Sequence, residues 1–214
     1  MRSVKVKICG MRDPQNIDDV ARLGPDYLGF IFSPASPRFV GTRLNTMQMR
    51  HFDSAIRKVG VFVDQPVDEI VRQKDAYFLN MIQLHGGESP EFCRELRAAV
   101  PGIEIIKAFA VHAGFDLASS APYEPYCALF LFDTQSAVPG GSGASFDWSL
   151  LSGYRGQLDY LLSGGIGRSN FKQALAWVRG HERAAGLDLN SRIETAPGVK
   201  SLALAGELLR EAKS

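Results

Sequence analysis

Three features are scarce in this sequence: cysteine, an excess of charge of either sign, and long apolar runs. Cys9, Cys93 and Cys127 are too few and too scattered for a disulfide framework or a CxxC metal site, which indicates a reducing compartment. The 24 basic and 23 acidic residues leave a net charge of +1, so nothing favours a nucleic acid or an anionic membrane as partner, although a local anion site remains open. No run approaches the roughly 18 apolar residues of a membrane span, and the first residues lack the apolar core of a signal peptide. We therefore expect a cytoplasmic protein.

The rest of the composition is that of an ordinary globular domain. Hydrophobic residues make up 45% of the 214 positions and charged residues 22%, and no Ser/Gly-rich linker divides the chain, so residues 1–214 are expected to form a single domain. Short apolar runs bounded by turn residues predict strands near 4–8, 26–31, 58–63, 81–84, 103–107, 128–132, 159–162 and 186–189. Helical segments are expected between them, near 14–23, 66–75, 90–99, 170–179 and 200–212, with weaker signals near 44–52, 113–119 and 147–152.

The alternation of strand and helix predicts the architecture. Strands followed one by one by helices need crossover connections and a parallel sheet, and eight such units close into a barrel. A doubly wound open sheet is the alternative, but it usually carries a GxGxxG turn after its first strand, and Cys9-Gly10-Met11-Arg12 does not supply one. The sequence therefore predicts an α/β protein with a single (β/α)8 TIM barrel.

Polar side chains follow several predicted strands at their carboxyl ends, the rim where barrel enzymes build their sites. Because strand side chains alternate, the apolar set of the first strand should face the helices, which turns Lys7 and Cys9 inward. The same alternation pairs Gln83 with His85 and leaves further polar residues at strand ends, namely Lys107, Asp133 and Asp188. We expect these side chains to converge on one cavity.

Each of these residues also has a purely structural interpretation. A free cysteine is most often a small buried hydrophobe, and a histidine or an aspartate can simply satisfy the backbone of a turn. Packing alone does not explain why a thiol, an imidazole, two carboxylates and two lysines should all face one cavity. The convergence therefore favours a catalytic site.

Two glycine-rich segments and one arginine indicate anion binding. Gly140-Gly141-Ser142-Gly143 follows the sixth predicted strand and Ser163-Gly164-Gly165-Ile166 the seventh, and glycines let backbone N–H groups approach a phosphate. A glycine pair alone could be only a tight connection, but barrels commonly bind phosphate at the loops after strands seven and eight. The expected phosphate contacts are Gly141, Gly143, Gly164, Gly165, Ser191 and Arg192. A proline-fixed loop presents Arg38, which could hold a carboxylate or could be a solvated surface residue.

Taken in order, these segments resemble those of phosphoribosylanthranilate isomerase, a barrel enzyme of tryptophan biosynthesis. No one segment is specific, but the ordered set covers nearly the whole chain: Lys7-Ile8-Cys9-Gly10-Met11, Gly29-Phe30-Ile31-Phe32 with Ser36-Pro37-Arg38, Val59-Gly60-Val61-Phe62-Val63, Gln83-Leu84-His85-Gly86, Phe132-Asp133-Thr134, Gly140-Gly141-Ser142-Gly143 with Phe146-Asp147-Trp148, Leu162-Ser163-Gly164-Gly165, and Asp188 through Pro197-Gly198.

The resemblance implies an Amadori rearrangement of N-(5-phosphoribosyl)anthranilate to the corresponding 1-deoxyribulose phosphate, with no metal and no organic cofactor. It implies that Cys9 is the general base, that Asp133 is the general acid, and that Arg38 faces the anthranilate carboxylate. His85, Asp188 and Lys7 are expected to contact the substrate, and we hypothesise that Lys7 helps to keep the thiolate charged. The expected partner is this small molecule alone, with the chain a monomer or a homodimer.

The chain departs from the family pattern at three positions that bear on phosphate binding or on a helix cap: Ala144, Arg192 and Ser201. Arg192 is expected to strengthen phosphate binding by its charge, although its bulk could hinder close backbone approach. Two other functions stay open: another phosphosugar barrel enzyme, such as a ribulose-phosphate epimerase or an indole-glycerol-phosphate synthase, and a catalytically silent phosphate-binding barrel.

Overall fold

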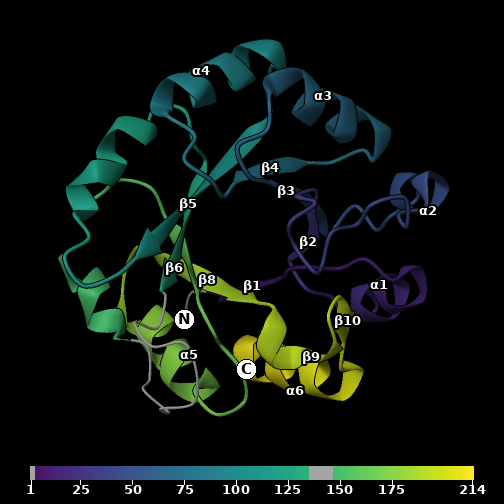
Figure 1. Ribbon diagram of the computed structural model, residues 1–214. Helices are drawn as coiled ribbons and strands as arrows, with labels where there is room; N and C mark the ends of the chain where they lie inside the picture. The colour runs from purple at the N-terminus through teal and green to yellow at the C-terminus, as the bar shows by residue number, and fades with distance from the viewer. Residues whose placement is uncertain (1–2, 135–146) are drawn as a thin grey trace.

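The predicted barrel is confirmed in a computed structural model that describes residues 3–134 and 147–214. Parallel strands form one closed ring, in which each strand pairs with its neighbours in chain order and the first strand pairs with the eighth (Figure 1). The strands are β1 (Lys5–Ile8), β2 (Tyr27–Ile31), β3 (Arg57–Phe62), β4 (Met81–Leu84), β5 (Glu104–Val111), β6 (Leu129–Thr134), β7 (Tyr160–Ser163) and β8 (Ala184–Leu189). All eight carboxyl ends therefore meet at one rim.

Side chains alternate between the inside of the barrel and the layer of helices around it. The interior holds an apolar cluster made of Val59, Met81, Ile106, Ala108, Leu129, Leu131 and Leu161. A larger cluster packs the opposite strand faces against the helices, and it contains Val4, Val6 and Ile8. The predicted division of the first strand into two faces is therefore confirmed, and Lys7 lies fully buried inside.

In the described residues, six α-helices cover the outside of the ring: α1 (Pro14–Ala21), α2 (Thr46–Arg50), α3 (Val67–Ala76), α4 (Pro90–Ala99), α5 (Phe171–Gly180) and α6 (Leu202–Lys213). Asp13 caps α1 by accepting from the amide of Asn16, and Ser89 caps α4 by accepting from that of Phe92. The weaker signals near 113–119 and 147–152 correspond to 3-10 helices, η1 (Leu117–Tyr123) and η2 (Trp148–Gly153). None of the helices in the described residues is long and apolar enough to cross a membrane.

The segment between β8 and the last helix contains structure that the sequence did not predict. A short 3-10 helix, η3 (Ser191–Ile193), leads into an antiparallel pair of strands, β9 (Glu194–Ala196) and β10 (Val199–Lys200). Gly198 turns this hairpin at a φ of +84°, in the region that favours glycine. The helix expected from about residue 200 begins at Leu202, where the hydroxyl of Ser201 accepts from the amide of Leu204. In Figure 1 the hairpin lies beside α6, close to α1.

Candidate active site

A pocket of about 160 Å³ opens at the carboxyl ends of the strands. The residues that line it are Cys9, Ile31, Val61, His85, Asp133, Ser163, Gly164, Gly165, Ile166, Asp188, Asn190 and Ser191. Most of the side chains expected to converge on one cavity are therefore brought together. The position of this pocket at the rim makes it the candidate active site.

Cys9 follows the last residue of β1. The backbone amide of Cys9 donates to the carbonyl of Leu189 at 2.8 Å, which continues the pairing of β1 with β8 by one residue. A Cβ on Gly29 would lie 2.7 Å from the Cys9 Sγ, so glycine at that position makes room for the sulfur. The backbone on both sides therefore fixes the thiol at the wall of the pocket.

A buried ion pair adjoins the thiol. The Lys7 Nζ lies 2.9 Å from Oδ1 of Asp188, and Ser163 Oγ donates to the other carboxylate oxygen at 3.2 Å. Burial opposes the charge on Lys7, but Asp188 and Cys9 outweigh it and raise the pKa of Lys7. Burial also raises the pKa of the Cys9 thiol, and Lys7 opposes this without cancelling it. Lys7 therefore stays charged and lowers the thiol pKa below what burial alone would give, and its role in keeping the thiolate charged stays a prediction.

Asp133 and His85 face each other across the same pocket. The His85 Nε2 is 3.6 Å from Oδ2 of Asp133, and both side chains are about one-third exposed or less, at 35% and 25%. On its other side, the His85 ring is hydrogen-bonded through Nδ1 to the Gln83 Nε2 at 2.8 Å. The amide of Gln83 thus orients the ring, as expected from their shared strand face.

The predicted phosphate residues fall into three groups. Gly164 and Gly165 line the pocket with φ values of +101° and +57°, which explains why this turn favours glycine, and Ser191, which follows β8, also lines it. Arg192 is exposed, packs against Gly167 and is absent from the pocket lining. Gly141 and Gly143, together with the departure at Ala144, lie outside the described residues.

Arg38 lies beside the pocket and is held by a partner that the sequence did not reveal. Its Nε and Nη2 both donate to the carboxylate of Glu194, at distances between 2.7 and 3.0 Å. Lys200 donates to the same carboxylate at 2.6 Å. Glu194 and Lys200 are 156 and 162 positions from Arg38, and no local pattern relates them.

The prediction that Lys107 faces the cavity is wrong. Its neighbours Ile106 and Ala108 belong to the interior cluster, so Lys107 points outward to the helix layer. There its Nζ lies 3.0 Å from Oε2 of Glu88 and donates to the carbonyl of Gly86 at 2.7 Å. The strand extends to Val111, so residue 107 lies in the middle of the strand and not at the rim.

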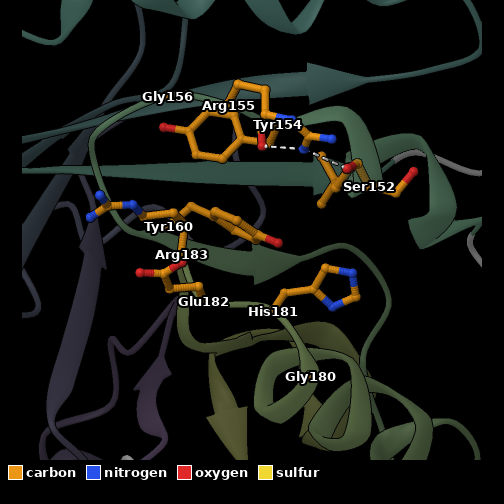
Figure 2. A pocket seen from close by; sticks show the side chains of 10 residues that line it. Ser152, Tyr154, Arg155, Gly156, Tyr160, Gly180, His181, Glu182 and Arg183 are labelled. Atoms are coloured by element: carbon orange, nitrogen blue, oxygen red, sulfur yellow. Dashed lines mark hydrogen bonds between the residues drawn. The ribbon is translucent and has the colours of Figure 1, made fainter.

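A larger cavity, of about 380 Å³, lies away from this chemistry (Figure 2). Its lining includes Tyr160, with which β7 begins, and Arg183, which precedes β8, so it opens at the amino ends of these strands. Arg155 there donates to the carbonyls of Ser152 and Tyr154. Since barrel enzymes place their chemistry at the carboxyl ends, the smaller pocket is the candidate site despite its size.

A closed parallel barrel with a thiol, an imidazole and carboxylates around one pocket at its carboxyl rim defines a (β/α)8-barrel enzyme. Comparison with known proteins gives the particular family. The chain belongs to the N-(5'-phosphoribosyl)anthranilate isomerase family, whose model matches residues 6–210. It is therefore an isomerase related to tryptophan biosynthesis.

Individual members of the family align with this chain over nearly its full length. The N-(5'-phosphoribosyl)anthranilate isomerase of Phocaeicola vulgatus is 40% identical over 208 residues, which is 97% of each chain. A crystal structure of phosphoribosyl anthranilate isomerase with reduced 1-(o-carboxyphenylamino)-1-deoxyribulose 5-phosphate is 29% identical, with a TM-score of 0.79 and 98% of each chain covered. Monomers of the dimeric enzyme from Thermotoga maritima are 29% identical, with a TM-score of 0.79 and 99% of each chain covered.

Proposed function

We propose that this chain converts N-(5'-phosphoribosyl)anthranilate to 1-(2-carboxyphenylamino)-1-deoxyribulose 5-phosphate, with Cys9 as general base and Asp133 as general acid. The observation that carries these roles is the shared pocket, because a thiol at the end of β1 and a carboxyl group of β6 line one cavity. Family membership supports the choice of substrate. The proposed location is the cytoplasm, in keeping with three free cysteines.

The first step opens the ribose ring. Asp133 in its protonated form donates to the furanose oxygen, the bond from that oxygen to C1 breaks, and the nitrogen lone pair forms a C1–N double bond. The oxygen leaves as a hydroxyl group and the nitrogen becomes a protonated imine. His85, 3.6 Å from the carboxyl group, is placed to interact with the carboxylate that remains.

The second step moves a proton from carbon. The positive imine acidifies the C2–H bond, so the Cys9 thiolate takes that proton and the electron pair forms a C1–C2 double bond while neutralising the nitrogen. The resulting enol loses its hydroxyl proton and gains one at C1, which gives the ketone. Because the imine nitrogen accepts the electrons, this route needs neither a metal nor an organic cofactor.

Residues in the pocket and beside it bind the two charged ends of the substrate. Backbone N–H groups around Gly164, Gly165 and Ser191 suit the phosphate, since glycine permits close approach. Arg38 suits the anthranilate carboxylate, and its guanidinium matches a carboxylate geometrically. Asp188 lines the pocket and is placed to contact the substrate, whereas Lys7 is fully buried and absent from the pocket lining, so it acts at the thiol and not by the direct substrate contact expected from the sequence.

The test is a fluorescence assay that follows consumption of phosphoribosylanthranilate without added metal. Cys9→Ala and Asp133→Asn are each expected to reduce the rate by roughly 100- to 10,000-fold. Cys93→Ala is the matched control, because Cys93 is also buried but belongs to the helix α4 and not to the pocket. If pure, folded wild-type protein lacked isomerase activity while still binding phosphate esters, the silent-barrel alternative would replace this proposal.

A further inference from the structure

We propose that Glu194 is a positioning residue that holds Arg38 ready for the carboxylate of the substrate, an inference that rests on the proposed function. Glu194 engages one edge of the guanidinium, since Arg38 Nε lies 2.9 and 3.0 Å from its two oxygens and Nη2 lies 2.7 Å from Oε2. This is a two-oxygen pairing, which fixes the plane of the guanidinium as well as its position.

Glu194 is itself fixed on its other side. Its Oε1 accepts from Lys200 Nζ at 2.6 Å and from the amide of Gly198 at 3.0 Å. Lys200 also donates to Oδ1 of Asn190 at 2.9 Å. The Glu194 and Lys200 side chains are 6% and 0% exposed, so the carboxylate cannot easily swing away from Arg38. Burial alone would raise the pKa of Glu194, but the hydrogen bonds from Arg38 and Lys200 outweigh it and lower the pKa.

The stem of Arg38 lies beside the pocket, next to residues that adjoin or line it. A Cβ on Gly10 would lie 2.6 Å from Arg38 Cδ and 2.7 Å from Asn190 Oδ1, so the arginine stem passes directly over the residue that follows Cys9. Asn190 and Cys9 both line the pocket. In the part of the chain that the structure describes, Nη1 of Arg38 has no hydrogen-bond partner, and the side chain is 18% exposed. One donor group of the guanidinium therefore remains available for a ligand.

The local charges favour an anionic ligand. Arg38 and Lys200 carry two positive charges, and Glu194 neutralises one of them. One surplus positive charge therefore remains on this group of three side chains. An arginine that is already ordered loses little side-chain freedom when it binds, whereas an unrestrained one must be ordered by the ligand.

Neutralising Glu194 should weaken carboxylate binding if Glu194 positions Arg38, whereas charge alone would strengthen it. Neutralising Glu194 removes a negative charge beside an anion site, and charge alone would then tighten carboxylate binding. The same tightening would follow if Glu194 merely competed with the substrate for Arg38. If Glu194 positions Arg38, its neutralisation weakens binding instead.

The experiment compares two ligands on the full chain. The first is reduced 1-(o-carboxyphenylamino)-1-deoxyribulose 5-phosphate, and the second is the same compound without the carboxyl group. Glu194→Gln is expected to weaken binding of the first ligand about tenfold. This is the loss of affinity expected when the ligand itself must order an arginine side chain. Binding of the second is expected to stay unchanged. With the natural substrate, KM should rise while kcat changes little, because the contact is made equally in the ground and transition states.

A matched control is available elsewhere in the barrel. Arg57 and Glu104 also form a two-oxygen ion pair, through Nη1 and Nη2 of the arginine at 2.7 Å for each contact, between the amino ends of β3 and β5. Glu104→Gln should leave both dissociation constants unchanged. Tighter or unchanged binding of the carboxylate ligand to Glu194→Gln, or an equal loss for both ligands, would overturn the proposal.

Two further variants guard against misfolding and separate this inference from the proposed function. Glu194→Gln leaves Lys200 buried without a counter-charge, so Glu194→Gln with Lys200→Met should restore folding and still show the selective loss. In an Arg38→Met background, Glu194→Gln should cause no additional loss of carboxylate binding. If the wild type turns over phosphoribosylanthranilate and the selectivity is absent, this inference alone fails. If the wild type shows no turnover, the proposed function fails first.

Discussion

Lys7 and Asp188 form a buried ion pair across the seam between the first and last strands of the barrel, with Nζ and Oδ1 2.9 Å apart. The two residues are register partners in β1 and β8, although 181 positions separate them in the chain. Burying an ion pair costs desolvation energy that the mutual attraction does not always recover. The ion pair lies beside Cys9, where the positive charge of Lys7 opposes the rise in the thiol pKa that burial causes.

Replacing Lys7 with methionine should raise the pKa of the Cys9 thiol further. The substitution removes the positive charge that favours the thiolate, while burial of the sulfur remains. The pKa is obtained from the pH dependence of thiol alkylation in a background that lacks Cys93 and Cys127. Lys5→Met serves as the control, because Lys5 pairs with Asp26 at the surface. An unchanged thiol pKa in Lys7→Met would contradict the role given to Lys7.

The rate should rise with pH through the neutral range. Burial raises the pKa of Cys9 above its ordinary value, so most of the thiol is protonated near neutral pH and only the thiolate accepts a proton from carbon. As the pH rises towards the thiol pKa, the active fraction increases and kcat/KM increases with it. Profiles of kcat/KM against pH for the wild type and for Cys9→Ala test this. A wild-type profile that falls across the same range would argue against a thiolate base.

Breaking the buried pair of Lys107 and Glu88 should destabilise the barrel. Their side chains are 3% and 2% exposed, and removal of one partner leaves a buried charge without compensation. Lys107→Met is expected to lower the free energy of unfolding by about 3–5 kcal/mol, measured by urea denaturation. Lys107→Met with Glu88→Gln should lose less. Arg94→Met, which breaks an exposed ion pair with Glu91 on α4, should change stability little.

Gly10→Ala should weaken substrate binding in addition to destabilising the fold. Gly10 has a φ of +77°, and its added Cβ would collide with Arg38 and Asn190. Gly102 has a similar φ of +82° with nothing within 4 Å of such a Cβ. Both alanine variants should lose about 1–2 kcal/mol of stability from the left-handed backbone, but only Gly10→Ala should raise KM. An equal KM in the two variants would mean that the collision is relieved without moving Arg38.

Local patterns predicted most of the fold. Strand and helix segments were identified because apolar periodicity and turn residues are properties of short windows, and Asp13 and Ser89 cap their helices for local reasons. The hairpin of Glu194–Ala196 and Val199–Lys200 was missed because its strands are too short to show an alternating pattern. The position of Lys107 at the rim is a wrong prediction, because the strand ends four residues later, at Val111.

The site was predictable only where strand position decides it. Cys9, His85, Asp133 and Asp188 all line the pocket, because the carboxyl ends of parallel strands meet at one rim. The pairing of Arg38 with Glu194 could not be predicted, since no local rule relates a loop after the second strand to a hairpin after the eighth. Contacts of that kind depend on the three-dimensional course of the chain.

The seam between β1 and β8 also affects how the enzyme is made. A ribosome releases the N-terminal strand first, so Cys9 and Lys7 emerge long before Asp188 and Leu189, which complete their surroundings. Through most of translation the thiol lacks the neighbouring strand that fixes its backbone, and the pocket lacks a wall. A nascent polypeptide that ends before β8 is therefore expected to have no isomerase activity. Catalysis should begin only when synthesis of the barrel is nearly complete.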